Sequence, residues 1–396
     1  MRSALGCDVA VIGAGLAGLW SARSLAWHRL RVALVEAEPA VDARVRTTGI
    51  FVRRTFKDFE FPSSTLGAPI RRVVLYSPQR RALELTSNRD EFRIGDMRAL
   101  SRALLQDCLN AGVIWLPGAR YRGLCEEGCC VRLTRDGARF DLAARFIIGA
   151  DGARSRVAAD LGLSRNTRFI AGVERVYDGC RETARALHCF LDPANAPGYI
   201  AWVVQDGAQA HVGVGGELSI PHTTLKEHAT VFRAQAALTR FMRSLDGLID
   251  LAGARQVERR AGLIPVNGVL KRIACTRGLL VGDAAGAVSP LTAGGLDACV
   301  RLSEFAASVA ARALAGDAEA LAAYRGDAFE ARFATRRWMR FGMSAAGLLT
   351  LELVCAGLRV PLLRGLANRF FFGDGSFPDP AHAVARRIHT PQPLAE

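Results

Sequence analysis

The chain has 396 residues, half of them hydrophobic, which is enough to bury a sizeable core and suggests two or three lobes. Its formal net charge is +14, and all but three of its 52 lysines and arginines are arginines. These basic residues are spread along the chain without a recognisable nucleic-acid module, so we predict no nucleic-acid partner. An anionic lipid surface or an acidic substrate fits the charge better. The arginine bias, with abundant alanine and glycine, favours a bacterial source with a GC-rich genome.

The N-terminal region, residues 8–36, has the pattern of a dinucleotide-binding unit. The pattern predicts a buried strand over Val9–Ile12, a helix over Leu19–His28 and a second strand over Val32–Val35. The first strand begins within ten residues of the N-terminus, so we expect no cleaved leader and a cytoplasmic location.

Three glycines separate the first strand from the helix. Gly13 suits a tight turn, Gly15 lets the backbone approach a pyrophosphate, and Gly18 lets helix and strand pack closely. The start of the helix offers unpaired N–H groups to phosphates. Glu36 ends the second strand, where an acid can accept hydrogen bonds from a ribose diol. This unit predicts a dinucleotide cofactor but does not distinguish NAD from FAD.

The middle of the chain alternates between predicted strands and one helix. Strands are predicted over Arg72–Tyr76 and Leu83–Thr86, followed by a helix over Met97–Gly112. A small sheet is then predicted from three further strands, Val113–Leu116, Cys130–Thr134 and Arg139–Leu142.

The ten cysteines are dispersed and form no CxxC pair, which favours a reducing compartment and free thiols. Cys125, Cys129 and Cys130 cluster in a predicted hairpin. They lack a histidine partner or a second cysteine pair, so we predict no metal site.

Two later segments repeat the arrangement of a buried strand that ends in a glycine and an aspartate. Phe146–Leu163 (FIIGADGARSRVAADLGL) contains Asp151 and Gly152. Arg277–Leu314 contains a strand over Gly278–Val281, then Gly282 and Asp283, then Pro290 and a long helix that follows Gly294 and Gly295.

These three segments, in this order and spacing, resemble the superfamily of group A flavoprotein monooxygenases and geranylgeranyl reductases over about residues 8–330. The resemblance implies an α/β fold in which a Rossmann-like FAD-binding domain, of the p-hydroxybenzoate hydroxylase type, is interleaved with an α+β substrate domain of mainly antiparallel sheet. The expected FAD-binding segments are 1–75, 95–163 and 263–325; the substrate domain is 76–94 and 164–262; C-terminal helices and a loosely held tail occupy 326–396.

The resemblance also assigns the third segment to the flavin. Asp283 would accept hydrogen bonds from the ribityl chain, and Pro290 would lie beside the ring. The helix start at Gly294, Gly295 and Leu296 would face the pyrimidine edge, where its partial positive charge stabilises negative charge that builds during reduction. The residues alone leave a helix N-cap as the alternative for Asp283 and a turn pair as the alternative for Asp151–Gly152.

Three arginines are weaker candidates for the cofactor. The arginine-rich loop Asp42–Phe51 would lie over the FAD pyrophosphate, where Arg44 or Arg46 neutralises phosphate charge; a solvated loop face explains either residue equally well. Family members carry an arginine or glutamine near the start of the next helix. Met97 stands there in this chain, with Arg98 one position later.

Within the substrate domain, Pro197–Gly216 is predicted to form a hairpin with its turn at Asp206–Gly207. It resembles the geranylgeranyl reductase segment Tyr-x-Trp-x-Phe-Pro, provided that one residue is inserted between Tyr199 and Trp202; the Phe-Pro pair is absent. Only Trp202 matches the corresponding halogenase motif, which disfavours halogenation. Tyr199 and Trp202 are therefore candidate substrate-pocket residues with Pro290, and an ordinary sheet aromatic is an equal interpretation of Trp202.

The apolar residues after position 326 are interrupted by Glu352, Arg359 and Pro361, so no membrane-spanning helix is predicted. Either a pair of core helices that closes the substrate cavity or a peripheral contact with the inner face of the membrane fits this segment.

The sequence thus predicts an FAD-dependent oxidoreductase that acts on a hydrophobic small molecule, most like the geranylgeranyl reductases. NAD(P)H or another donor would reduce the flavin without a dinucleotide domain of its own, since no second GxGxxG occurs. A monooxygenase that hydroxylates or epoxidises its substrate is the alternative. A non-catalytic FAD-binding assembly factor would not need Gly294 and Gly295. No catalytic acid or base, oligomeric state or particular substrate is assigned.

Overall fold

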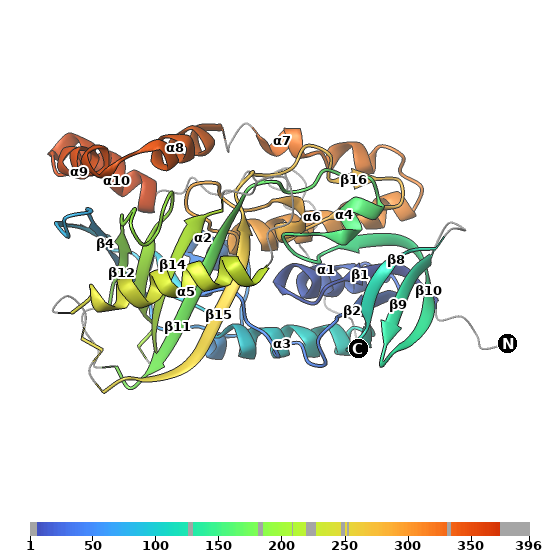
Figure 1. The fold of residues 1–396 in the computed structure, drawn as a ribbon. Coiled ribbons are helices and arrows are strands. Elements are labelled where there is room, and N and C mark those ends of the chain that lie inside the picture. The colour runs from blue at the N-terminus through green and yellow to red at the C-terminus, as the bar shows by residue number, and fades with distance from the viewer. Residues whose placement is uncertain are drawn as a thin grey trace.

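The computed structural model describes residues 6–125, 130–180, 185–207, 209–218, 227–246, 250–251, 253–330 and 334–372. Two sheets lie side by side along the length of the molecule, and the C-terminal helices α8, α9 and α10 lie across one end of the second sheet (Figure 1). Cys129 and the tail from residue 373 lie outside the described residues.

The first sheet is the Rossmann-like part of the fold. Its strands run in the order β16 (Ala274–Cys275), β17 (Gly278–Leu280), β10 (Ala138–Gly149), β1 (Gly6–Ile12), β2 (Val32–Val35) and β7 (Ile114–Leu116). The pairs from β17 to β7 are parallel. Their apolar runs are buried on both faces, as expected for a parallel sheet that helices cover.

Three helices pack together on this sheet. Helix α1 (Leu16–Trp27) contacts both α3 (Met97–Asn110) and α6 (Leu296–Leu314). Two α1 side chains donate hydrogen bonds to Glu304 of α6: Trp20 Nε1 at 2.9 Å and Ser24 Oγ at 2.7 Å. The N-terminal motif and the third motif are therefore joined by helix packing as well as by the sheet.

The carboxyl ends of four parallel strands are in register. Val35 of β2 lies opposite Ile12 of β1, Ile12 lies opposite Gly149 of β10, and Gly149 lies opposite Leu280 of β17. Ligands of doubly wound sheets bind at the carboxyl ends of the strands. All three glycine-bearing turns and Glu36 thus leave the sheet along one line.

The second sheet is antiparallel except for one pair. Its order is β15 (Arg255–Pro265), β11 (Phe169–Asp178), β14 (Gln209–Glu217), β13 (Ala201–Gln205), β12 (Leu187–Phe190), β4 (Arg72–Tyr76) and β5 (Ala82–Thr86), and only β12 and β4 run parallel. Helix α5 (Glu227–Arg243) covers one face with Leu238 and Phe241. Because β4 and β5 precede α3 in the chain, the chain passes between the two sheets more than once.

The remaining elements are shorter. The paired strands β3 (Ile50–Val52) and β6 (Phe92–Ile94) form a separate ribbon, and β8 (Arg120–Leu124) and β9 (Cys130–Arg135) extend the first sheet through β10. The other helices are α2 (Arg53–Asp58), α4 (Arg156–Asp160), α7 (Gly326–Glu330), α8 (Ala334–Ala345), α9 (Leu348–Gly357) and α10 (Pro361–Phe372). Among the described residues, no helix is both long and apolar enough to cross a membrane.

The predicted fold class is confirmed, with one difference in the first sheet. The strand predicted over Arg139–Leu142 and the strand expected before Asp151 are a single strand, β10. Its first half pairs antiparallel with β9 and its second half pairs parallel with β1. Exposed residues such as Arg145 alternate with buried ones at the junction, which broke the apolar pattern in the sequence.

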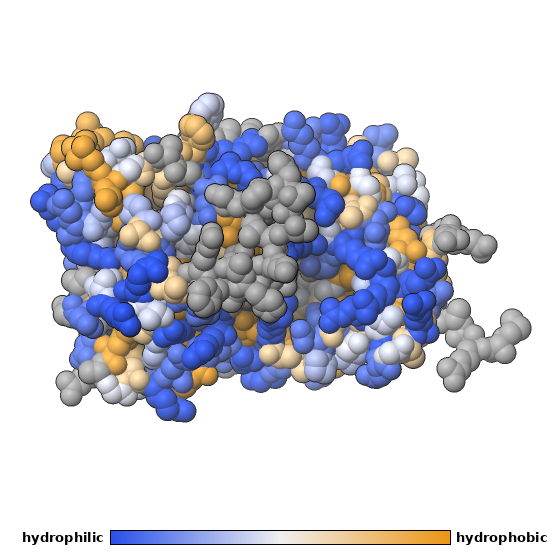
Figure 2. All heavy atoms as spheres, viewed as in Figure 1, coloured by the Kyte–Doolittle hydropathy of each residue, from blue (hydrophilic) through white to orange (hydrophobic). Residues whose placement is uncertain are grey.

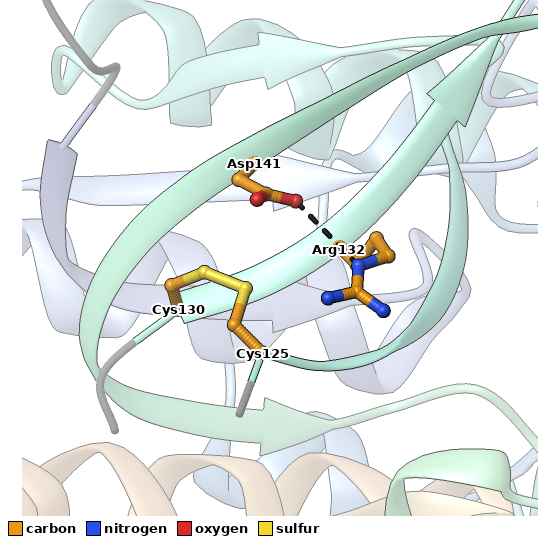
Figure 3. The surroundings of a disulfide bond; sticks show 4 residues. All are labelled: Cys125, Cys130, Arg132 and Asp141. Atoms are coloured by element: carbon orange, nitrogen blue, oxygen red, sulfur yellow. Dashed lines mark ion pairs between the residues drawn. A yellow bond between two sulfur atoms is a disulfide. The ribbon is translucent and has the colours of Figure 1, made fainter. Parts of the chain in front are cut away.

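The expectation of free thiols is wrong at one position. Cys125 and Cys130 form a disulfide across the β8–β9 hairpin, and Asp141 lies beside it with its carboxylate 3.9 Å from Arg132 (Figure 3). The two Cα atoms are 5.4 Å apart, within the range a disulfide spans, because antiparallel pairing brings the strand ends together. The sulfurs lie within 4.8 Å of an Asp141 oxygen, but bonded to each other they are not thiolate ligands for a metal.

Candidate cofactor site

The three glycine-bearing turns are in direct contact. A Cβ atom at Gly13 would lie 2.5 Å from the carbonyl oxygen of Ala150, and one at Gly18 would lie 1.8 Å from the carbonyl oxygen of Gly13. A Cβ at Gly282 would lie 2.8 Å from the Cβ of Ala17. These approaches leave no room for a side chain, so glycine is required where the first turn meets the second and the third.

Gly15 differs from these glycines because a Cβ there would meet nothing within 4 Å. Packing therefore does not explain this glycine, whereas close approach of a ligand does. Gly15 is also the N-cap of α1, and no side chain caps that helix. Helices α3 and α4, by contrast, are capped by Asp96 and Ser155. The N–H groups of the first turn of α1 are thus left for an anion such as a pyrophosphate.

Glu36 holds the first turn. One of its carboxylate oxygens accepts a hydrogen bond from the backbone N–H of Ala14 at 2.8 Å, and the other accepts one from the N–H of Glu38 at 2.9 Å. A carboxylate has about four acceptor sites, so this half-buried group can still accept hydrogen bonds from two ribose hydroxyls.

Asp151 caps a helix. Its carboxylate accepts hydrogen bonds from Ser155 Oγ at 2.6 Å and from the backbone N–H groups of Arg156 at 2.7 Å and Val157 at 3.1 Å, at the start of α4. Burial raises the pKa of this carboxyl, and these hydrogen bonds oppose the rise. Gly152 has a φ of +83°, which favours glycine. These observations favour the turn interpretation of the pair, and a contact with FAD stays a prediction.

The carboxylate of Asp283 differs from that of Asp151 in its hydrogen bonding. It lies in the turn after β17, and none of the described residues forms a hydrogen bond with its half-buried carboxylate. Burial raises the pKa of Asp283 to about 6, and the charge of Arg46 partly opposes the rise. The interpretation as an N-cap is not supported, since no side chain caps this turn. A half-buried acid without hydrogen-bond partners suits a ligand whose hydroxyl groups donate hydrogen bonds to it.

The segment 289–296 completes this side of the site. Pro290 is buried, and Ala293 has a φ of +51°, an uncommon conformation for a residue with a side chain. A Cβ at Gly295 would lie 3.8 Å from an Asp283 carboxylate oxygen. Gly295 is the N-cap of α6, whose first residue is Leu296, and no side chain caps this helix either. Gly294 is exposed beside it. The arrangement leaves a second uncapped helix start beside Asp283.

The loop 42–49 carries two arginines, and the charge of one of them, Arg46, acts on Asp283. Arg44 and Arg46 are both exposed, and no described residue forms an ion pair with either. The backbone of Arg46 packs against Gly262 of β15, where a Cβ would lie 3.5 Å from the Arg46 carbonyl oxygen. Arg98 is already engaged: it donates to the carbonyl of Asp42 and pairs with Glu258 at 2.5 Å. Met97 is buried beneath Gly49.

The rings of Tyr199 and Trp202, the two aromatic residues predicted for the pocket, pack against glycines of the second sheet. A Cβ at Gly213 would lie 2.2 Å from the Trp202 ring, and one at Gly215 would lie 2.6 Å from the Tyr199 ring. Tyr199 donates a hydrogen bond to the carbonyl of Thr292 at 2.6 Å, and its ring belongs to the same cluster as Ala293. The face of the sheet opposite α5 therefore meets the 289–296 segment, as a roof over the flavin requires.

Comparisons with known proteins agree with this geometry. Residues 125–332 match the family model "FAD binding domain", and residues 8–91 match the model "FAD dependent oxidoreductase". The chain belongs to the superfamily of FAD-dependent monooxygenases and geranylgeranyl reductases. It is an FAD-dependent oxidoreductase, and its uncapped helix starts, the open side of Gly15 and the unpaired Asp283 all fit FAD.

Two curated relatives illustrate the similarity. Digeranylgeranylglycerophospholipid reductase 2 of Methanopyrus kandleri is 30% identical over 324 residues, which cover 78% of each chain. Digeranylgeranylglycerophospholipid reductase of Methanothrix thermoacetophila is 28% identical over 337 residues, covering 80% of this chain and 82% of the relative. Both organisms are archaea, so these relatives lend no support to the predicted bacterial source.

The similar solved structures show the same fold. A geranylgeranyl bacteriochlorophyll reductase-like protein from Thermoplasma acidophilum superposes with a TM-score of 0.80 at 20% identity, covering 96% of this chain and 99% of that chain. The p-nitrophenol 4-monooxygenase PnpA from Pseudomonas putida gives 0.67 at 18% identity, with 97% of each chain covered. The flavin-dependent brominase Bmp2 gives 0.66 at 12% identity, covering 97% of this chain and 99% of that chain.

In such an oxidoreductase the flavin supplies the redox chemistry. The chain's own contribution is binding and orientation. The start of α1 would hold the pyrophosphate, Glu36 the adenosine ribose and Asp283 the ribityl chain, and the start of α6 would stabilise negative charge at the pyrimidine edge.

One group of residues at this site was missed by the sequence analysis. Glu174, at the centre of the mostly buried strand β11, contacts Thr48, Trp202, His211 and Arg260. The only signals in the sequence are a glutamate within FIAGVERVYD and a histidine within QAHVGVGG, each a polar residue on a strand that is otherwise buried.

Proposed function

We propose that this chain is a reductase that saturates carbon–carbon double bonds in the prenyl chain of a lipid. The observation that carries the proposal is sequence similarity over more than three quarters of the chain to enzymes named digeranylgeranylglycerophospholipid reductase. The higher TM-score with the geranylgeranyl reductase-like protein than with the monooxygenase or the brominase is consistent with it.

We also propose that helices α8–α10 dock on an anionic lipid bilayer. Their large exposed apolar side chains form an apolar face at one end of the molecule (Figure 2), with Leu349 74% exposed and Leu362 81% exposed. Its other members are Trp338, Met339, Phe341, Leu348, Leu353, Val354, Val360, Leu363 and Leu366. An apolar patch of this kind is unusual on a monomeric surface and marks an interaction site.

The charges beside the apolar face, and the way α9 and α10 are anchored to the sheet, indicate what binds this face. Exposed Arg359, Arg364 and Arg369 belong to the same segment as the apolar face. Arg359 and Arg364 donate to the carbonyls of Ala82 and Glu84 of β5, so their charge lies where this segment meets the sheet, beside an acyl-binding face, which suits anionic headgroups. The opposite side of α9 and α10 is held on the second sheet by Cys355 and Ala367, which belong to its apolar cluster. This outward exposure supports the peripheral contact over the alternative of two core helices.

The electron donor belongs to the proposal as well. NAD(P)H or another reductant would reach the flavin directly, because the described residues contain one Rossmann-like sheet and it is the one that holds the FAD motifs. Oligomeric state is not part of the proposal.

The test is an anaerobic turnover experiment. The FAD-loaded full-length chain is reduced with dithionite and mixed with vesicles that contain a geranylgeranylated glycerophospholipid, and the lipid is analysed by mass spectrometry. We expect a gain of two hydrogen atoms for each double bond reduced; parallel reactions with NADH and NADPH identify the donor. A lipid that is unchanged without oxygen but gains an oxygen atom in air would instead show a monooxygenase. A reduced flavin that never transfers electrons to the lipid would contradict the reductase.

A further inference from the structure

A buried cluster of charges lies between the second sheet and the loop 42–49. Its centre is Glu174, which is 3% exposed. The Glu174 carboxylate accepts hydrogen bonds from Trp202 Nε1 at 3.1 Å, from Arg260 at 3.2 Å and from the hydroxyl of Thr48, and it lies 3.3 Å from His211 Nδ1. These partners come from three other strands and one loop, so a single carboxylate joins the second sheet to the loop 42–49.

The cluster places His211 between two acids. Its acids are Glu174, Asp206, which lies 3.4 Å from His211 Nε2, and Glu258, which pairs with Arg260 at 2.7 Å. Its arginines are Arg260 and Arg98. These three carboxylates, the two guanidinium groups and the imidazole of His211, which faces both Glu174 and Asp206, form one largely buried network.

The groups that face His211 favour its protonated form. Burial alone lowers the pKa of His211, but its contacts with Asp206 and Glu174 outweigh burial and the repulsion of Arg260, so the pKa lies above its ordinary value. Arg185 lies beside Gly207 at the same turn and adds a further positive charge there. Burial alone raises the pKa of Glu174. Its contacts with His211, Arg260 and Thr48 outweigh burial, so this pKa lies below its ordinary value.

The cluster holds two parts of the chain beside the predicted cofactor site: the loop 42–49 and the indole of Trp202. Arg260 donates to the carbonyl of Thr47 at 2.9 Å, and Thr48 donates to Glu174. Both threonines directly follow Arg46, whose charge acts on Asp283. The far end of the same loop is held by Arg98 and by Arg102, which pairs with Asp42 at 2.7 Å. The indole of Trp202 is held over Gly213 by the same carboxylate.

We propose that Glu174 and His211 are positioning residues for FAD binding: as a buried ion pair they hold the Arg46 loop and the Trp202 indole in place at the cofactor site. The inference concerns FAD and goes beyond the proposed function, since it does not depend on which substrate the enzyme reduces.

A pH dependence follows from this arrangement. The pKa of His211 is raised in the folded protein, so protonated His211 stabilises the folded state. This stabilisation is fully present below the ordinary histidine pKa and is lost as the pH rises through the raised value. Loss of the proton removes the positive charge that lies between the Glu174 and Asp206 carboxylates in this largely buried space. The Arg46 loop is then less well held, and FAD affinity decreases.

The experiment is a fluorescence titration of the FAD-free full-length chain with FAD between about pH 6 and pH 9. Wild type is compared with His211→Gln, which keeps hydrogen bonding but cannot be charged. His188→Gln is the matched control, because His188 lies in the same sheet, contacts the Tyr76 hydroxyl at 3.1 Å and has a pKa lowered to about 4, chiefly by burial. His188 is therefore neutral throughout the titration.

We expect the wild-type dissociation constant for FAD to rise by roughly tenfold across this range. His211→Gln should bind FAD weakly at every pH with a flat profile, and His188→Gln should follow wild type. A His211→Gln profile that keeps the wild-type slope would overturn the proposal, whatever its absolute affinity. If that variant does not fold, the wild-type profile decides: an affinity that does not fall at high pH also overturns it.

Discussion

The carboxylate of Glu36 and the backbone N–H of Ala14 are joined by a 2.8 Å hydrogen bond that ties the end of β2 to the first glycine turn. This bond places an acid and the start of α1 at the same point, where a dinucleotide presents its ribose and its phosphates. The shape of the turn and the recognition of the ribose therefore depend on one side chain.

Replacing Glu36 with alanine removes two hydrogen bonds to backbone N–H groups, those of Ala14 and Glu38. Hydrogen bonds to a charged group contribute roughly 1.5–3 kcal/mol, so we expect FAD affinity to fall by at least tenfold. A flavin fluorescence titration measures it. Glu38→Ala, which removes a nearby acid of equal charge, should leave the affinity within about a factor of two. Equal losses in the two variants would show that net charge matters and the turn does not.

The Asp283→Asn substitution should stabilise the FAD-free protein in a pH-dependent way. The pKa of Asp283 is raised to about 6 in the folded chain. The protonated carboxyl therefore favours the folded state at acid pH, and this effect is lost as the pH rises through that value. At pH 7–8 the ionised carboxylate opposes folding by on the order of 2 kcal/mol. Thermal unfolding should thus show a gain for the variant near about pH 8 that is smaller near about pH 5. FAD binding should weaken, and a variant less stable than wild type at pH 8 would contradict the assignment.

Membrane docking depends on the exposed leucines of α9 and α10. We expect the double substitution Leu349→Asp, Leu362→Asp to weaken binding to anionic vesicles at least tenfold, because each change removes apolar contact and adds a repelled charge. Vesicle co-sedimentation measures this. Leu109→Asp is the control, since Leu109 is 42% exposed on α3, outside the apolar face. Binding that is unchanged in the double variant would exclude this face as the docking surface.

Arg340 lies on α8 and is only 1% exposed, yet none of the described residues forms a hydrogen bond with its three guanidinium nitrogens. It has one ion pair, with Glu217 at 3.4 Å, and burial lowers its pKa. Glu217 keeps a closer partner in Arg168, at 2.7 Å. We expect Arg340→Met to leave the unfolding free energy unchanged or to raise it by about 1–4 kcal/mol. Chemical denaturation measures it, with half-exposed Arg168→Met as a near-neutral control. A clear destabilisation by Arg340→Met would show that the contacts of the guanidinium with Glu217 and with the Tyr199 ring outweigh the cost of its burial.

The cofactor motifs were predictable because their signals are local. The run Val9–Ile12, the glycines after it and Glu36 lie within one short stretch, and the α6 helix ends at Leu314 as predicted. The alignment of Ile12, Gly149 and Leu280 follows once these strands are taken as parallel neighbours in one sheet.

The Glu174 cluster could not be predicted in the same way. Its members lie on β11, β13, β14, β15, α3, the turn between β13 and β14, and the loop 42–49. Most of their contacts depend on strand register, which a single sequence does not specify. The Cys125–Cys130 disulfide was missed for a related reason. Spacing alone does not tell whether two cysteines near a hairpin face each other, whereas the pairing of β8 with β9 does.

The central claim is that the three turns bind one FAD, and glycine substitutions separate this role from packing. Gly15→Ala meets no atom within 4 Å, whereas Gly18→Ala would lie 1.8 Å from the Gly13 carbonyl oxygen. The most direct measurement is a titration of FAD into the FAD-free wild type and Gly15→Ala, with thermal unfolding of each. We predict that wild type binds one FAD per chain and that Gly15→Ala unfolds at the wild-type temperature but binds FAD at least tenfold more weakly. A wild-type chain that binds no flavin, or a Gly15→Ala chain that binds it as tightly as wild type, would contradict the account.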